Sequence, residues 1–239
     1  MSDNLETLKT WVREAKRIVF FGGAGVSTES GISDFRGVDG LYRQKYRWPP
    51  EEILSNGFFM RKTDEFYRFY RDKMLIEGAQ PNPAHLKLAQ WEREGKLLAV
   101  VTQNIDGLHQ AAGSKKVYEL HGSTLRNYCM DCGKFYGADA IRNSVGVPKC
   151  ACGGTIKPDV VLYGESLDSD CIVGAVNAIA NADLLIIGGT SLNVYPAAGL
   201  IDDYRGSRLV LVNKSPTPRD DRADLIIREP IGEVFAQLP

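Results

Sequence analysis

The stretch VFFGGAGVSTESGISDFRG, residues 19–37, begins as an apolar strand and becomes a loop rich in glycine and hydroxyl side chains. Gly22, Gly23 and Gly25 allow the backbone to approach a pyrophosphate and to point N–H groups at it. An ordinary strand–helix turn is the alternative, because clustered glycines alone are a weak signal. The stretch also departs from the dehydrogenase fingerprint, since Thr28 stands where a third glycine belongs. It therefore predicts dinucleotide binding without a clear redox role.

Polar side chains continue through this loop. Three side chains, Ser27, Thr28 and Ser30, add hydroxyl donors for a phosphate. An acid, an aromatic ring and a guanidinium follow at Asp34, Phe35 and Arg36. No acid ends a second strand about 20 residues on, as the hydride-transferring enzymes require. The set could hold the middle of a dinucleotide, but it does not resemble a hydride-transfer site.

Further apolar runs recur along the chain in the manner of parallel strands that are buried on both faces. The later runs are separated by segments long enough for crossover helices, at residues 169–182 and 195–206. This alternation predicts an α/β fold with an open, doubly wound, Rossmann-like parallel sheet. The predicted strands are Ile18–Phe21, Leu97–Val101, Leu184–Ile187, Leu209–Val212 and Leu225–Ile227.

Two regions interrupt the alternation. Residues 37–95 show no clear strand and are predicted to form loop and helices, including one that opens at Pro83. Residues 125–157 are rich in Cys and Gly and too poor in large apolar residues for a core of their own. We expect both to be insertions that form a smaller lobe, a helical one and a zinc ribbon. The large domain would then comprise residues 1–36, 96–124 and 158–239, with an amphipathic helix at Asn4–Lys16.

Size and charge limit the possible functions. The chain has 239 residues, of which 44% are hydrophobic, so it can bury one large core with a small insertion. A net charge of −1 and a pI of about 6.3 give no overall basic field for nucleic acid or anionic membrane. No stretch reaches the ~20 apolar residues of a membrane helix, and the first 21 residues are charged throughout, without the long apolar run of a signal peptide. We expect a cytoplasmic protein.

Hydrogen-bonding side chains crowd the end of one predicted strand, where TQNIDG follows the run LLAVV. Ligands of open α/β sheets bind outside the carboxyl ends of the strands. Gln103 and Asn104 could bond ribose hydroxyls there, and Asp106 could accept from the N–H of a carboxamide such as that of nicotinamide.

The chain has three histidines as candidates for a base near neutral pH, His85, His109 and His121. His85 follows a helix start and suits a structural role, and His109 lies in a turn, where it could cap or face solvent. His121 alone could be a satisfied core histidine. Its place at the end of a predicted strand, before Gly122, favours a functional role.

Four cysteines form two close pairs, Cys129/Cys132 and Cys150/Cys152, each near glycines. This spacing is typical of a structural zinc ribbon with a closed tetrahedral site. A redox Cys-x-x-Cys is the rival, but no thioredoxin-like βαβ pattern surrounds it. The fifth, Cys171, suits a buried position in a helix.

Taken together, the segments resemble the sirtuin family of NAD-dependent protein lysine deacylases. GAGVSTESGISDFR, TQNIDGLH, HG at 121–122, the four cysteines, KPDVVLYGE and GGTSLNVYP occur in the family's order across nearly the whole chain. The resemblance implies a cleft between a Rossmann-like domain and a small lobe, where NAD and an acyl-lysine peptide meet. The cysteine spacing predicts one structural zinc ion per chain, and the charge and hydropathy predict neither nucleic acid nor membrane as a partner. We expect a monomer.

The resemblance also implies the residues that bind NAD. Phe35 would guard the nicotinamide, Asp106 would grip the carboxamide, and Ile231 would lie near the adenine. The full implied set is Gly23, Ala24, Gly25, Thr28, Asp34, Phe35, Arg36, Gln103, Asn104, Ile105, Asp106, His121, Gly189, Thr190, Ser191, Asn213, Lys214, Ser215 and Ile231.

In the mechanism that the resemblance implies, the acyl oxygen attacks C1′ of the nicotinamide ribose and nicotinamide leaves. His121 is then the general base that activates a ribose hydroxyl, while Asn104 organises the ribose and a water. The products are free lysine and O-acyl-ADP-ribose. An ADP-ribosyltransferase built on the same site is one rival, and a non-catalytic nucleotide-binding or zinc-ribbon module is another.

The peptide substrate would bind as an added strand, mainly through backbone bonds. The implied contacts are Val160, Tyr163, Gly164, Glu165, Asn193, Val194 and Tyr195. Relatives that prefer succinyl or malonyl groups carry Tyr-x-x-Arg in the small lobe, but here Tyr70 follows Tyr67 where that Arg would be. Because a buried acyl carboxylate without a cation is costly, we expect acetyl or another neutral acyl group as the substrate.

Overall fold

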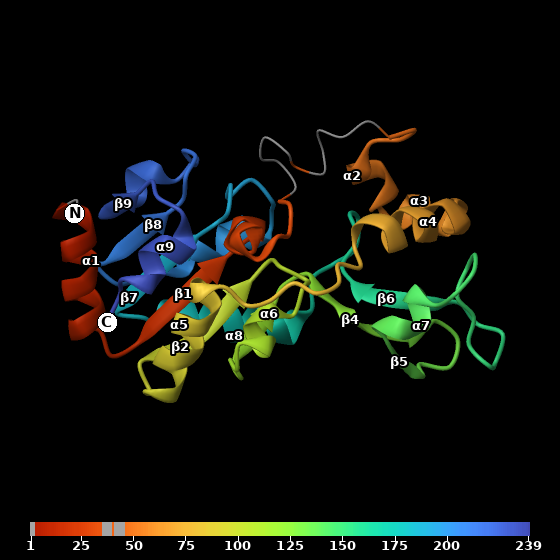
Figure 1. The fold of residues 1–239 in the computed structure, drawn as a ribbon, viewed down its shortest axis with the longest axis horizontal. Coiled ribbons are helices and arrows are strands. Elements are labelled where there is room, and N and C mark those ends of the chain that lie inside the picture. Colours follow the sequence, from red (N-terminus) through yellow and green to blue (C-terminus); the bar gives the residue numbers. More distant parts are fainter. Residues whose placement is uncertain (1–2, 35–39, 41–45) are drawn as a thin grey trace.

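The computed structural model describes residues 3–34, 40 and 46–239, which form a large lobe and a small lobe. The large lobe is built on a six-stranded sheet, and the small lobe on a three-stranded sheet with short helices (Figure 1). Both termini lie on the large lobe, and β4 leads from the large lobe into the small one. The expected α/β architecture with a smaller inserted lobe is confirmed.

The large sheet is parallel, with the strand order β3-β2-β1-β7-β8-β9. Chain order reverses between β1 and β7, and such a point leaves a crevice at the carboxyl ends of the strands. The strands are β1 (Ile18–Gly22), β2 (Leu97–Thr102), β3 (Val117–Glu119), β7 (Leu184–Gly188), β8 (Leu209–Val212) and β9 (Leu225–Ile227).

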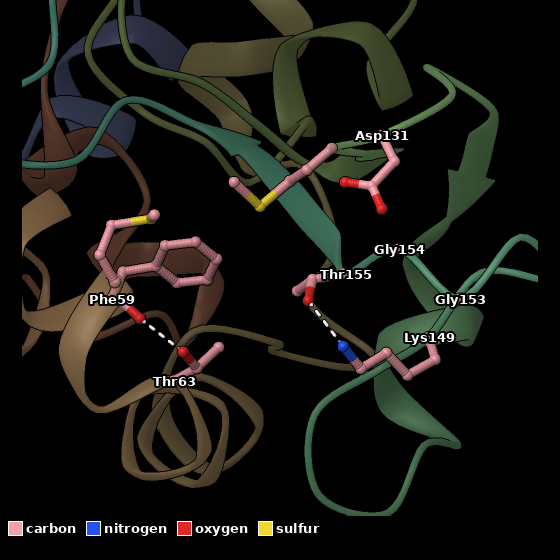
Figure 2. A pocket seen from close by; sticks show the side chains of 9 residues that line it. Phe59, Thr63, Asp131, Lys149, Gly153, Gly154 and Thr155 are labelled. Carbon is pink, nitrogen blue, oxygen red and sulfur yellow. Dashed lines mark hydrogen bonds between the residues drawn. The ribbon is translucent and has the colours of Figure 1, made fainter.

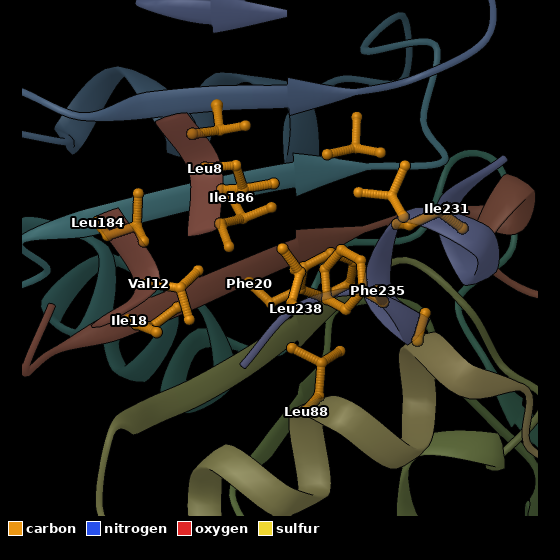
Figure 3. Packing of buried hydrophobic residues seen from close by; sticks show 14 of the residues in the cluster. Leu8, Val12, Ile18, Phe20, Leu88, Leu184, Ile186, Ile231, Phe235 and Leu238 are labelled. Carbon is orange, nitrogen blue, oxygen red and sulfur yellow. The ribbon is translucent and has the colours of Figure 1, made fainter. Parts of the chain in front are cut away.

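Helices cover both faces of this sheet because successive strand residues point to opposite sides. Phe20 belongs to the core cluster on the side of α1 (Asp3–Glu14), α5 (Pro83–Arg93) and α9 (Ile231–Ala236), which Figure 3 shows from close by. Phe21 belongs to the opposite cluster, with α8 (Ser169–Ala180) and the 3₁₀ helix η4 (Ala197–Asp203). Full burial of one such side chain contributes about 1.5–3 kcal/mol.

The small lobe has a core of its own. Its sheet is antiparallel, in the order β5-β4-β6, and α4 contributes the buried rings of Phe66, Tyr67 and Tyr70. Its elements are α2 (Pro50–Ile53), α3 (Asn56–Arg61), α4 (Thr63–Lys73), β4 (Gly122–Cys129), β5 (Phe135–Gly137), α7 (Ala138–Arg142) and β6 (Ile156–Val160). The shorter elements are η1 (Ala24–Val26), η2 (Thr28–Ser30), α6 (Leu108–Ala111) and η5 (Asp220–Arg222).

The lobe boundaries differ from those expected. α5 falls within the 37–95 insertion, yet its Leu88 and Trp91 pack into the core beneath the large sheet. The small sheet also extends beyond 125–157, since Gly122 pairs with Val160. The physical reason is that α5 buries an apolar face, which the large sheet covers.

Among the described residues, the helices are all too short or too polar to cross a bilayer.

Candidate active site

The loop after β1 packs directly against the loop after β7. Gly25 N–H donates to the Gly189 carbonyl at 2.8 Å, and Gly23 N–H donates to the Gly188 carbonyl at 3.2 Å. A Cβ on Gly25 would lie only 2.8 Å from the Gly189 Cα. The glycines therefore bring the two loops together at the point where strand order reverses.

Ser27 joins this loop to the polar segment after β2. Its hydroxyl donates to Asp106 Oδ2 at 2.7 Å and accepts from Asn104 Nδ2 at 3.1 Å. We expected the hydroxyls of Ser27, Thr28 and Ser30 to face a phosphate, but in the structure all three bond to protein groups. Thr28 donates to the Gly25 carbonyl at 3.0 Å, and Ser30 accepts from Asn82 at 3.0 Å. The bridging role of Ser27 was missed.

Three strand-end segments converge on Gln103. Its Nε2 donates to Thr190 Oγ1 at 3.0 Å, and its carbonyl lies 3.1 Å from His121 Nδ1. Thr102, which the sequence did not single out, accepts from the Asn104 N–H at 3.0 Å. The residues predicted after β2, β3 and β7 are thus brought together at one edge of the sheet.

The surroundings of His121 suit a general base. A carbonyl oxygen only accepts, so Nδ1 carries the proton and Nε2 keeps its lone pair. Burial lowers the pKa of His121 below the ordinary 6.5, and the bond to Gln103 opposes this in part. The imidazole is therefore neutral near pH 7, the form that can take up a proton.

Two contacts fix the backbone that follows His121. Gly122 has φ +75°, and a Cβ there would lie 1.9 Å from the Asp159 carbonyl oxygen, so only glycine fits. Arg126 donates to Glu119 at 2.6 Å and to Asp159 at 2.8 Å, which ties β3 of the large sheet to β6 of the small one. His121 thus lies at the junction of the lobes, where Ile105 also packs against the small-lobe core.

The other two histidines lie beneath the site. His85 Nδ1 accepts from the Asn82 N–H at 3.3 Å in the capping box of α5. His109 lies buried in α6, which excludes the solvent-facing position that was one of its two expected roles, and the ring centroids of His85 and His109 are 4.7 Å apart. Burial lowers the pKa of His85 to about 4 and lowers that of His109 well below its ordinary value.

Residues predicted for the adenine end lie around the carboxyl ends of β7 and β8. Asn213 follows β8, and its Nδ2 donates to the Ser215 carbonyl at 2.7 Å, while Lys214 is exposed. Ile231 begins α9 and is buried, and its Cδ1 would lie 2.3 Å from a Cβ on Gly188. Ser191 is half-buried beyond Thr190.

Four more residues of the first loop were predicted to bind NAD. Ala24 begins η1 and is half-buried, as is Asp34 at the end of the described part of the loop. Phe35 and Arg36 lie outside the described residues. Their predicted contacts with the dinucleotide stay predictions.

The segments predicted to hold the peptide are partly used within the protein. Tyr163 exchanges backbone bonds with Leu54 and Asn56, at 2.9 Å each. Glu165 accepts from the Leu162 N–H at 2.9 Å, from Asn56 at 2.8 Å and from Lys157 at 3.1 Å. Its carboxylate is therefore structural, and its backbone N–H donates to the Leu162 carbonyl at 2.9 Å, which leaves the Gly164 backbone and the Glu165 carbonyl for a peptide.

The remaining predicted peptide contacts lie on two segments, one at the end of β6 and one after β7. Val160 ends β6 and is 7% exposed. Asn193, Val194 and Tyr195 follow the β7 loop, where Asn193 and Tyr195 are exposed and the Val194 carbonyl accepts from the Ala198 N–H at 2.8 Å.

The four cysteines form one cluster, with all sulfur atoms within 4.8 Å of one another. Three pairs, Cys129–Cys152, Cys132–Cys150 and Cys132–Cys152, are 3.5–3.6 Å apart. Four thiolates about 2.3 Å from a zinc ion would be about 3.7 Å apart in a tetrahedron, so the cluster fits the metal. The Tyr136 hydroxyl donates a hydrogen bond to the Cys150 sulfur at 3.0 Å.

The position of the arginine expected in relatives that take dicarboxylic acyl groups is occupied by Tyr70, and the two arginines of α4 bond to other groups. Tyr70 is fully buried and stacks on Phe66, and burial raises the pKa of its hydroxyl. Arg68 pairs with Asp64 at 2.9 Å. Arg71 donates to Ser144 at 3.1 Å and to the Gly146 carbonyl at 2.9 Å.

A separate hollow lies on the small lobe, away from the residues described above. It has a volume of about 240 Å³ and is lined by α3, α4 and the cysteine ribbon, with Phe59, Thr63 and Lys149 among its residues. Figure 2 shows Lys149 donating to Thr155 among the residues that line it. Nothing in it resembles the predicted cofactor site.

Comparison with known families matches residues 23–196 to the Sir2 family. An NAD-dependent protein deacetylase of Clostridium perfringens (strain 13 / Type A) is 57% identical and covers 100% of this chain and 99% of its own. Another, of Clostridium acetobutylicum, is 57% identical over 98% of this chain and 97% of its own. A solved Sir2–p53 peptide–NAD⁺ structure is 40% identical, with a TM-score of 0.86 over 98% of this chain and 96% of its own. A Sir2 structure with deacetylated p53 peptide and 3′-O-acetyl-ADP-ribose has a TM-score of 0.88 at 39% identity, over 97% of this chain and 96% of its own.

Proposed function

This chain belongs to the Sir2 family, and from that premise we propose that it is an NAD-dependent protein lysine deacetylase whose site is the carboxyl edge of β1, β2 and β7. NAD supplies the ADP-ribose that accepts the acetyl group, with loss of nicotinamide. The observation that carries the proposal is the convergence of His121, Asn104 and Asp106 around Gln103 and Ser27.

Each of these side chains has a role that its geometry supports. Each carboxylate oxygen of Asp106 accepts one bond, from Ser27 or from the Leu108 N–H, and has capacity for a carboxamide N–H. Only Nδ2 of Asn104 is bonded among the described side chains, so its Oδ1 can accept from a ribose hydroxyl. His121 would take a proton from a ribose hydroxyl through Nε2.

The loops after β1, β7 and β8 would hold the rest of NAD. Gly23, Ala24, Gly25, Thr28 and Thr190 would lie at the phosphates, and Asn213 and Ile231 at the adenosine. The N–H groups of Gly23, Gly25 and Val26 already donate to protein carbonyls, so the glycines would act by letting the backbone approach the phosphates closely.

We propose that an acetyl-lysine peptide binds between the lobes as an added strand, along Val160–Glu165 and Asn193–Tyr195. Relatives of known structure support this, since one is described as Sir2 bound to acetylated peptide. The cysteine cluster would hold a structural zinc ion, which supplies rigidity and takes no part in the chemistry. That the protein is a cytoplasmic monomer stays a prediction.

The experiment is to incubate the purified chain with NAD and matched acetylated and unmodified lysine peptides. Mass spectrometry should find free lysine peptide, nicotinamide and O-acetyl-ADP-ribose in equal amounts, with the acetylated peptide only. Transfer of ADP-ribose to the peptide or the protein would instead favour an ADP-ribosyltransferase. Nicotinamide release that does not depend on the acetyl group would overturn the proposal.

A further inference from the structure

The start of α5 contacts the cofactor loop although it lies outside the strand ends that form the site. Asn82, the N-cap of α5, is 6% exposed. Its Oδ1 accepts from the Ala84 N–H at 3.0 Å, while its Nδ2 donates to the Val26 carbonyl at 2.7 Å and to Ser30 Oγ at 3.0 Å. One side chain therefore caps the helix and holds two points of the loop after β1.

The loop needs such an anchor because it has little regular structure of its own. η1 and η2 are 3₁₀ turns of 3 residues each, and turns this short are weakly stabilised by their own bonds. Val26 ends η1 and Ser30 ends η2, so Asn82 is hydrogen-bonded to both turns. Ser27, which is hydrogen-bonded to Asn104 and Asp106, lies in the sequence between these two bonded residues.

The same turn of α5 also contacts α6, the short helix that follows Asp106. His85 accepts from the Asn82 backbone N–H, and its ring lies against His109 in α6. α6 begins two residues after Asp106 and is preceded by Gly107 in a left-handed conformation. A shift at the start of α5 would therefore change the position of Asp106 as well as that of the glycine loop.

We propose that Asn82 is a positioning residue for NAD: its amide fixes the loop after β1 in the arrangement that receives the dinucleotide, without touching the dinucleotide itself. The inference rests on the proposed NAD site. It assigns Asn82 an effect on NAD affinity that is separate from its effect as a helix cap.

Two substitutions separate these effects. Asn82→Asp and Asn82→Ser both keep an oxygen that can cap α5, but neither can donate to the Val26 carbonyl and Ser30 together. Asp168→Ser is the matched control, because Asp168 caps α8 through the Cys171 N–H at 2.7 Å on the opposite face of the sheet. Each protein is measured for NAD and ADP-ribose dissociation constants by calorimetry, for the two KM values, and for melting temperature.

We expect both Asn82 variants to raise the Kd and KM for NAD about tenfold, equivalent to about 1.4 kcal/mol. The peptide KM and the kcat at saturating NAD should stay within about twofold of the original. Asp168→Ser likewise changes a helix cap while keeping a capping oxygen, and it should leave NAD binding unchanged. If Asn82→Asp does not fold, Asn82→Ser carries the test.

The inference is overturned if the folded Asn82 variants bind NAD as tightly as the original protein, or if the peptide KM rises in step with the NAD KM. Failure of the original protein to bind NAD would instead overturn the proposed function. The calorimetric measurement needs no turnover, so the two failures are distinguishable.

Discussion

Ser27 and Asp106 belong to different strand-end loops, and a hydrogen bond of 2.7 Å joins the Ser27 hydroxyl to the Asp106 carboxylate. The same hydroxyl accepts from Asn104, and Ser27 is only 1% exposed. One buried oxygen thus sets the distance between the glycine loop and the two side chains proposed to hold nicotinamide and its ribose.

Ser27→Ala should therefore weaken catalysis more than stability. It removes two hydrogen bonds and leaves the Asp106 carboxylate without one donor, and a bond to a charged group is worth about 1.5–3 kcal/mol. We expect kcat/KM for NAD to fall about 10- to 100-fold. Ser114→Ala is the control, since Ser114 is also buried, outside the proposed site, and should leave kcat/KM unchanged. Equal kinetics for the two variants would contradict the role of Ser27.

His121→Ala should abolish nearly all deacetylation and leave the protein folded. General-base help is typically worth about 10²–10⁴ in rate. Calorimetry should still show NAD binding, and the melting temperature should change little. An unchanged kcat would remove His121 from the mechanism.

The pH dependence of kcat/KM, which reports the ionisation of the free enzyme, should reflect the same imidazole. The deprotonated form is the base, so activity rises with pH through the pKa of His121. Because burial lowers that pKa, the acid limb should have its midpoint below pH 6.5. Steady-state rates between pH 5 and pH 8 would test this, and a midpoint above 6.5 would contradict it.

Loss of the metal should unfold the small lobe rather than block one chemical step. Cys129 and Cys150 are buried in the core of that lobe, and structural zinc binding is coupled to folding. Chelation, or Cys129→Ser, should lower the melting temperature and the kcat together. Cys171→Ser is the matched control, since Cys171 lies on α8 away from the cluster, and it should retain zinc by elemental analysis. A chelated protein with intact melting behaviour would argue against a structural metal.

Neutral acyl groups should be preferred over dicarboxylic ones. The place of a pairing cation on α4 is taken by the buried Tyr70, and Arg68 and Arg71 are engaged elsewhere. An unpaired buried carboxylate is strongly unfavourable. We expect kcat/KM for an acetyl-lysine peptide to exceed that for the succinyl peptide at least about tenfold. Side-by-side kinetics on one peptide sequence decide it, and a succinyl preference would refute the expectation.

Mild acid should destabilise the fold through the histidines. The pKa values of His85, His109 and His121 are all lowered, that of His85 to about 4. Their stabilisation is present above the unfolded pKa of about 6.5 and is lost as pH falls toward the folded values, by up to about 1.4 kcal/mol per pH unit for each. Urea unfolding between pH 7 and pH 5 should show this slope. His85→Gln, which keeps an acceptor in the capping box, should show a shallower one.

The large sheet could be predicted from the sequence because its strands are continuous apolar runs, as at Leu184–Ile187, with helices between them. The place of α5 could not. The spacing of Leu88 and Trp91 shows that one helix face is buried, but not whether the large sheet or the small lobe covers it.

The candidate site was predictable where local patterns carry it. The spacing of the cysteines indicates a metal, and the strand-end position of Asn104 and Asp106 indicates a ligand. The bridge from Ser27 could not be predicted, since its partners lie 77 and 79 residues away. The same holds for Arg126, whose two partners come from different sheets.

During translation, β1 leaves the ribosome long before either of its neighbours, since β2 begins at Leu97 and β7 at Leu184, after the small lobe. Ile18 pairs with Leu97 on one side and Leu184 on the other. A nascent chain therefore carries an apolar strand with an unpaired edge for most of its synthesis, a state prone to aggregation. Chaperone demand and slow maturation are the expected cost of placing the first strand at the centre of the sheet.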